Sequence, residues 1–150
     1  MTNELYDPEM LQKHKRAGKI VFEVKDSVDI VWMSQETMAS FFDVKKKDII
    51  LNLSQVLKQN NLDKSKHIRT VSYVKNSLSN AVSIQERQYS FTVICLLGFV
   101  LVSDVATAFR LWVVSDFERY LKWGIHSTPT RIKSSEKRKA YAERLFKKLL

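Results

Sequence analysis

The strongest constraint in this sequence is a pair of short apolar repeats with helical spacing, separated by a polar break. In the first repeat, Phe41 and Phe42 follow Met38 by three and four residues, which places all three on one face of a helix. Residues 43–44 interrupt the spacing. It then resumes with apolar side chains at i, i+4, i+7 and i+8, namely Ile49, Leu53, Val56 and Leu57. The pattern therefore predicts a helix-turn-helix at residues 34–57.

The ends and the polar side of these helices support the same prediction. Ser34 is a residue type that caps helix N-termini, and the Glu36 carboxylate suits the positive end of the helix dipole. The second helix is expected to carry a polar stripe opposite its apolar face. That stripe consists of Lys45, Asp48, Asn52, Gln55 and Gln59.

β-branched and aromatic residues predict strands on both sides of the helix pair. Residues 19–32 read as two strands around a tight turn at Asp26, Ser27 and Asp29. Residues 67–74 and 81–91 read as a second hairpin, in the place of the wing of a winged helix-turn-helix. The expected fold class is α+β: a β-hairpin and a winged helix-turn-helix-like N-terminal half, followed by a helical C-terminal half.

Outside these elements, the pattern divides the chain into three parts. Residues 1–18 are expected to form a polar arm with at most one helical turn, and residues 58–66 a loop. A helix from Thr92, partly broken at Gly98, is followed by a long helix that Asp104 caps. Residues 19–125 then form the main domain, and residues 126–150 a linker and a basic C-terminal helix.

The charge balance favours a polyanionic partner. The formal net charge is +9 and the pI is about 9.7, which points first to nucleic acid. The apolar run at residues 91–102 is too short to span a bilayer, which takes about 20 residues. The polar N-terminus does not resemble a secretory signal, and Cys95 is the single cysteine. A cytoplasmic location and no membrane partner are therefore expected.

The expected ligand of the helix pair is duplex DNA. Lys45, Lys46 and Lys47 open the second helix, where their charges reach phosphates. Asn52 and Gln55 carry amides that match the adenine edge in the major groove. The full set of expected DNA contacts is Lys45, Lys46, Lys47, Asn52, Gln55, Gln35 and Arg69.

Catalysis has little support in the sequence. His14, His67 and His126 are scattered without metal-ligand spacing, and three glycines hardly suffice for a phosphate-binding loop. The apolar neighbours of Cys95 argue against a nucleophile. We expect no enzyme activity, no metal and no cofactor.

Several phrases, in order along residues 19–125, resemble the RhuM virulence-associated family. The phrases are Val31-Trp32-Met33-Ser34-Gln35, Met38-Ala39, Phe42, Val44, Ile49, Leu62-Asp63, Tyr89, Gly98, Ser103, Ala106-Thr107, Phe109-Arg110, Trp112, Tyr120-Leu121 and residues 122–125. The resemblance implies a bacterial, mobile-element-associated or virulence-associated regulator of transcription with a DNA-binding N-terminal region, similar to phage antirepressors.

Departures from the family pattern leave an alternative open. Asp48 and Ile50 stand where the family has polar residues, and Val100 and Val105 stand where it has arginine. A polar surface has thus become more apolar. The alternative is an antirepressor-like module that binds a protein partner and has lost DNA binding. A homodimer is a further expectation, with the basic C-terminal helix as one candidate contact.

Overall fold

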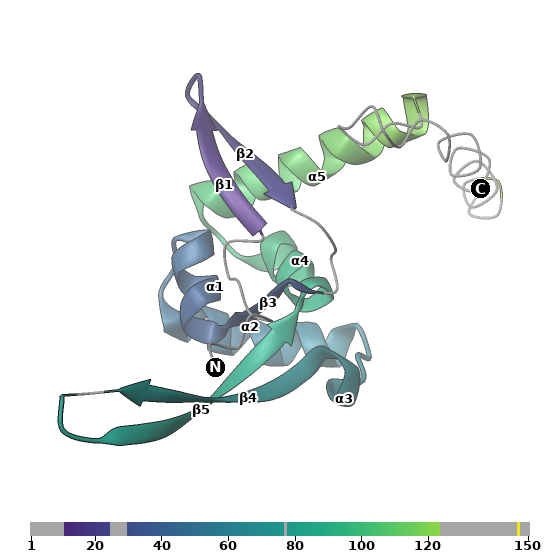
Figure 1. Cartoon of the computed structure of the whole chain (residues 1–150). Coiled ribbons are helices and arrows are strands. Elements are labelled where there is room, and N and C mark those ends of the chain that lie inside the picture. Colours follow the sequence, from purple (N-terminus) through teal and green to yellow (C-terminus); the bar gives the residue numbers. More distant parts are fainter. Residues whose placement is uncertain (1–10, 25–29, 77, 124–146, 148–150) are drawn as a thin grey trace. The chain divides into compact units, whose positions relative to one another are not determined.

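The computed structural model describes residues 11–24, 30–76, 78–123 and 147. The chain divides into two compact units, residues 1–109 and residues 110–150. The expected linker and basic helix at residues 126–150 lie outside the described residues, apart from Lys147. The elements in chain order (Figure 1) are β1 Leu11–Arg16, β2 Lys19–Val24, β3 Trp32–Ser34, α1 Gln35–Phe42, α2 Lys46–Gln59, α3 Lys64–His67, β4 Ile68–Asn76, β5 Ala81–Ser90, α4 Phe91–Val100 and α5 Asp104–Trp123. The molecule is thus an α+β protein.

The first unit begins with a hairpin that the sequence pattern did not predict. Strand β1 pairs with β2 in an antiparallel two-stranded sheet, and the turn residues Ala17 and Gly18 both have positive φ, 46° and 77°. Two successive positive φ values match the twist of a tight hairpin. The prediction of a polar arm is therefore wrong for residues 11–18. The predicted pairing of two strands within residues 19–32 is also wrong, because β3 joins another sheet.

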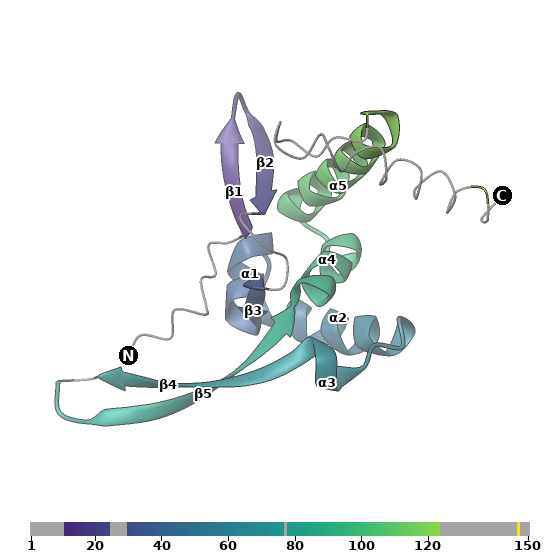
Figure 2. The same cartoon turned by 45° about the vertical axis from the view of Figure 1, so that its right-hand side comes forward.

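The second sheet has three strands in the order β3-β5-β4, all antiparallel. Helices α1 and α2 lie between β3 and β4 in the chain, so the connectivity is that of a winged helix-turn-helix. The predicted wing is confirmed as the β4–β5 hairpin, which extends away from the rest of the sheet (Figure 2). The predicted loop at residues 58–66 needs correction, because α2 continues to Gln59 and residues 64–67 form the short helix α3.

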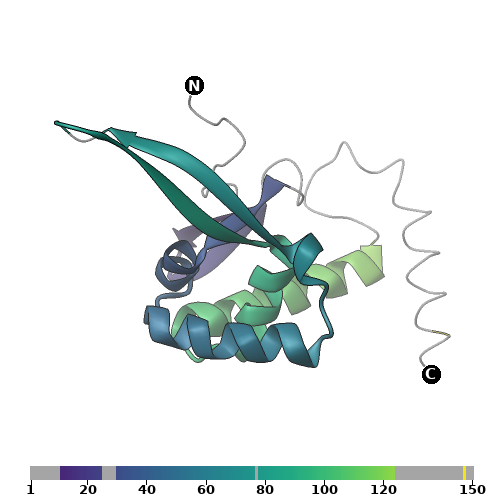
Figure 3. The same cartoon turned by 90° about the horizontal axis from the view of Figure 1, so that it is seen from below.

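The helix pair forms where the sequence predicted it. The Ser34 hydroxyl accepts a hydrogen bond from the Thr37 amide at 3.2 Å and caps α1. Asp43 ends α1 in the left-handed conformation, with φ 54°, and the chain turns before α2 begins at Lys46. The predicted core residues Ile49, Leu53, Val56 and Leu57 are all buried. Figure 3 shows α2 beside α4, whose own buried residues include Val93, Ile94 and Leu97.

Aromatic rings join the β1–β2 hairpin to the helices. Phe22 lies 5.7 Å from Phe41 and 5.4 Å from Phe109 between ring centroids, and Phe42 lies 5.6 Å from Phe109. Edge-to-face pairs such as Phe22–Phe109 and Phe42–Phe109 add about 0.5–1.5 kcal/mol each to the burial energy. Phe22, Phe42 and Phe109 are no more than 1% exposed, so this cluster is the centre of the first unit's core.

Gly98 allows the closest approach in this core. A Cβ at Gly98 would lie 2.5 Å from Phe109 Cε1 and 3.2 Å from Phe42 Cε1. Helix α4 continues through Gly98, so the predicted break there is wrong. The cap of α5 also differs from the prediction, because the Ser103 hydroxyl rather than Asp104 accepts from the Ala106 amide, at 3.0 Å. The same hydroxyl donates to the Phe42 carbonyl at 2.7 Å.

The second unit is described only as far as helix α5 extends. The sequence spacing also predicts an apolar stripe along this helix, and its members Trp112, Val113, Tyr120 and Leu121 are all partly exposed. Phe117 of the stripe is 49% exposed. In the described part of the chain no single helix is long and apolar enough to cross a membrane, and only the bent pair α4–α5 passes that test jointly.

Candidate nucleic-acid interface

The most exposed face of α2 is not the polar stripe that the sequence predicted. The stripe runs along the flank of the helix, where Asp48 and Asn52 are half-buried. Directly opposite the buried residues, at the helical spacing i, i+4, i+7, i+8 and i+11, lies a fully exposed face. Its members are Lys47, Leu51, Ser54, Gln55 and Lys58, and we call this set the outward face of α2.

The outward face combines two cations, two hydrogen-bonding side chains and one apolar side chain. Leu51 is 70% exposed and lies at its centre, one turn from Lys47 and one turn from Gln55. Leu51, Ser54 and Lys58 were not among the predicted contacts. The signal that finds them is the helical wheel, because they lie opposite Ile49 and Leu53. Polarity alone does not reveal this face, because the apolar Leu51 lies at its centre.

Lys45 and Lys46, two further predicted contacts, lie at the start of α2. Lys45 occupies the N-cap position, and no side chain caps the helix there. The first amides of α2 therefore keep the partial positive charge of an uncapped helix end. The side chains of Lys45, Lys47 and Gln55 are exposed and form no hydrogen bond or ion pair among the described residues, so these three predicted side chains are available to a ligand.

Lys46 is exposed but already engaged. Its ammonium group forms an ion pair and hydrogen bond with the Glu36 carboxylate of α1. The hydrogen bond from Lys46, followed by a backbone hydrogen bond at Glu36, lowers the pKa of Glu36 below its usual value of 4.5. Glu36 thus remains ionised at neutral pH and partly neutralises the lysine cluster. In residues 34–58 the three carboxylates of Glu36, Asp43 and Asp48 face four lysines.

The remaining predicted contacts are half-buried, and their side chains form interactions within the protein. The Asn52 amide donates to the Asp48 carbonyl one turn back, at 2.8 Å. The Gln35 amide donates to the Tyr89 hydroxyl at 3.2 Å. The Arg69 guanidinium lies 4.4 Å from the centre of the Trp32 ring, and its Nε donates to Gln88 Oε1 at 2.9 Å. These interactions position α1 and the base of the wing.

The wing carries few charges that remain available. Gln88 accepts from Arg69 and donates to Glu86 at 3.0 Å, so Arg69 and Glu86 are tied to one buried amide. Beyond this network the exposed cations of the two strands are Lys75 and Arg87. The exposed tip is largely apolar or neutral, with Val74, Leu78 and Val82 all more than half exposed.

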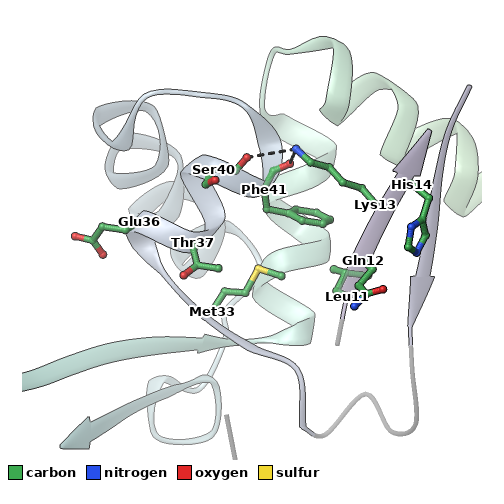
Figure 4. Close-up of a pocket in the computed structure, with 9 residues that line it drawn as sticks. All are labelled: Leu11, Gln12, Lys13, His14, Met33, Glu36, Thr37, Ser40 and Phe41. Atoms are coloured by element: carbon green, nitrogen blue, oxygen red, sulfur yellow. Dashed lines mark hydrogen bonds between the residues drawn. The ribbon is translucent and has the colours of Figure 1, made fainter. Parts of the chain in front are cut away.

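The β1–β2 hairpin is the most basic element of the first unit. It carries Lys13, Lys15, Arg16 and Lys19 against the single carboxylate of Glu23, which lies 3.8 Å from His14. Lys13 donates to the carbonyls of Ser40 and Phe41, at 3.4 and 3.0 Å, across an open groove of about 690 Å³ (Figure 4). These carbonyls belong to the C-terminal turn of α1, the negative end of the helix dipole, where a cation is stabilising.

Features of an enzyme are sparse in the described residues. Burial raises the pKa of the Cys95 thiol to about 12, so the thiol is protonated and inert at neutral pH. The part of the chain that the structure describes contains no cluster of His, Cys, Asp or Glu suited to a metal ion. The absence of enzyme activity stays a prediction.

Comparisons with protein-family models, with curated proteins and with solved structures found no match to this chain. The likeness to the RhuM family stays a prediction from sequence phrases. A function for this chain can therefore be proposed only from its sequence and from the geometry of the first unit.

Proposed function

We propose that this chain binds duplex DNA through α2, as a winged helix-turn-helix regulator. One observation carries the proposal: the outward face of α2 is exposed and bears lysines, a serine and an amide, while the opposite face is buried in the core. A recognition helix needs this division, because one face must pack on its partner while the other enters the groove.

The dimensions and chemistry of α2 suit a major groove. An α-helix with its side chains is about 10–12 Å across, and the groove of B-DNA is about 12 Å wide. Lys45, Lys47 and Lys58 supply positive charge to the flanking phosphates, and the uncapped start of α2 adds the positive end of the helix dipole. The Gln55 amide can form a bidentate pair with an adenine edge.

The finer parts of the proposal come from the sequence. A cytoplasmic regulator of mobile-element or virulence-associated type is what the RhuM-like phrases imply. A homodimer is part of the proposal because one recognition helix contacts only a few base pairs, whereas two helices one turn of DNA apart read a longer site.

The test is a titration of fluorescent duplex DNA with the full chain at several salt concentrations. Each phosphate contact contributes a slope of about −0.9 to log K against log salt. The triple variant Lys45→Ala, Lys47→Ala, Lys58→Ala should flatten the slope by up to about 2.7, three times that contribution. A matched variant that removes Lys64, Lys66 and Lys75 should flatten it less. Absence of binding by the unmodified chain at low salt would refute the proposal.

One observation favours a second candidate function. Ile50 is 48% exposed and Leu51 is 70% exposed, and apolar side chains at this level of exposure also suit a protein partner. Under this alternative, the chain is an antirepressor-like module that docks α2 on another protein. A pull-down after nuclease treatment separates the two functions. A partner retained without DNA, and lost with Leu51→Lys, would favour the alternative.

A further inference from the structure

The tip of the β1–β2 hairpin holds three cations that the fold does not neutralise. The side chains of Lys15, Arg16 and Lys19 are exposed, and none of the three forms a hydrogen bond or ion pair with another side chain within residues 11–24, 30–76 and 78–123. The hairpin's one carboxylate, Glu23, lies at the other end of the strands beside His14. The positive charge is therefore concentrated at the turn.

The register of the hairpin makes this concentration costly for the isolated protein. Arg16 and Lys19 are directly opposite one another across the two strands, on either side of the turn. Like charges in directly opposed positions destabilise a strand pair. An anion bound between them would remove this repulsion, which identifies the tip as a place where a ligand with negative charge is favoured.

The hairpin is also held in place at its base. Lys13 binds the last carbonyls of α1, and Phe22 packs against Phe41 and Phe109. Leu11 and Phe22 are buried. The tip thus extends from a fixed platform, so that little backbone entropy is lost when its side chains bind a ligand.

The platform contacts the end of α1, the helix that precedes α2. Lys13 binds the last carbonyls of α1, and α2 begins at Lys46, four residues after α1 ends at Phe42. Arg16 is three residues beyond Lys13 along β1, a rise of about 10 Å. The cations of the turn therefore stand clear of the contact between the hairpin and α1.

From these observations we infer that the tip of the β1–β2 hairpin is a second DNA-backbone site, at which Lys15, Arg16 and Lys19 bind phosphates of the duplex that α2 reads. The inference rests on the proposed function, since it assigns a further contact with the same duplex. The tip binds without regard to base sequence, because phosphates carry no sequence information.

The experiment compares two double variants of the full chain on one duplex over a range of salt. Arg16→Ala with Lys19→Ala removes two cations from the tip. Lys64→Ala with Lys66→Ala removes two exposed cations from α3 and changes the net charge equally. The tip variant should flatten the salt slope by up to about 1.8, twice the contribution of one phosphate, and weaken binding at 0.1 M salt at least tenfold. The α3 variant should change both quantities little.

The outcomes separate this inference from the proposed function. If the unmodified chain binds DNA and the tip variant binds as well as the α3 variant, the second site is refuted and the function of α2 stands. If the unmodified chain does not bind DNA, the proposed function fails, and the tip site fails with it. Neither variant should unfold at a lower temperature than the unmodified chain, and the tip variant should unfold at an equal or higher temperature because it loses the repulsion between Arg16 and Lys19. A loss of binding is then not a loss of fold.

Discussion

The two hairpins of the first unit differ in how each is held and in what each exposes. The β1–β2 hairpin is short, anchored at its base by Phe22 and Lys13, and basic at its tip. The β4–β5 wing is longer, pairs from Ile68–Tyr89 to Asn76–Ala81, and is exposed along its outer half. Near the base of the wing, the charged side chains of Arg69 and Glu86 are both hydrogen-bonded to the Gln88 amide.

The comparison shows that the neighbours of a charged side chain on a strand decide whether that side chain is available to a ligand. Arg69 looked like a phosphate contact because it lies in the wing, yet Trp32 and Gln88 hold it. Lys15 and Arg16 looked like part of a polar arm and Lys19 like the start of a strand, yet the hairpin turn gathers all three at one point. Exposed positive charge on the strands of the first unit is therefore found on the first hairpin more than on the wing.

The largest expected effect tests the anchoring of the two hairpins with one aromatic residue from each. Phe22→Ala should lower the free energy of unfolding by about 3–5 kcal/mol, because it empties a buried site between two rings. Tyr73→Ala in the wing should change it by only about 0.5 kcal/mol, because Tyr73 is 41% exposed. Urea denaturation measures both. Similar losses for the two variants would contradict the comparison.

The second effect concerns Gly98, which lies against the Phe109 ring on which Phe22 packs. Gly98→Ala should destabilise the protein by about 1–3 kcal/mol, since the new methyl group overlaps the buried Phe109 ring. Alanine is otherwise the better helix former by about 1 kcal/mol, so the sign of the change is diagnostic. Denaturation together with hydrogen exchange should show loss of protection in β1–β2 and little change in β4–β5. A stabilised variant would show that the ring cluster is loosely packed.

The third effect isolates the polar anchor. Lys13→Ala should cost about 1 kcal/mol, because two carbonyls at the end of α1 lose a charged donor that is itself partly exposed to water. Lys15→Ala removes the same charge from the same strand and should cost no more than about 0.5 kcal/mol. Equal costs would mean that Lys13 acts only through net charge.

The smallest effect compares exposed leucines of α2 and of the wing. If Leu51 meets a thymine methyl group in the major groove, replacing that thymine with uracil should weaken binding about fourfold, from about 0.8 kcal/mol per methyl group. Leu51→Ala should abolish this discrimination, whereas Leu78→Ala at the tip of the wing should preserve it. Discrimination that survives Leu51→Ala would place the methyl contact elsewhere.

Much of the fold could be predicted because the apolar spacing of α1, α2 and the wing is local. The β1–β2 hairpin could not, because β1 consists mostly of polar residues and the hairpin is anchored by Phe22 of β2, whose partners Phe41 and Phe109 lie far along the chain. Among the predicted DNA contacts, the exposure of Lys45, Lys47 and Gln55 could be predicted from their place on the helix. The hydrogen bonds of Gln35 and Arg69 could not, because their partners, Tyr89 and Gln88, are distant in sequence. DNA contact by any of these residues stays a prediction.

The most direct test of the account is a titration of the ¹⁵N-labelled chain with duplex DNA, followed by NMR. The account predicts that amide signals of Lys47, Leu51, Gln55 and Lys58 shift together with those of the β1–β2 tip, while those of the buried side of α2 move little. Shifts confined to the wing or to α5, with α2 unchanged, would contradict the assignment of α2 as the DNA-reading helix.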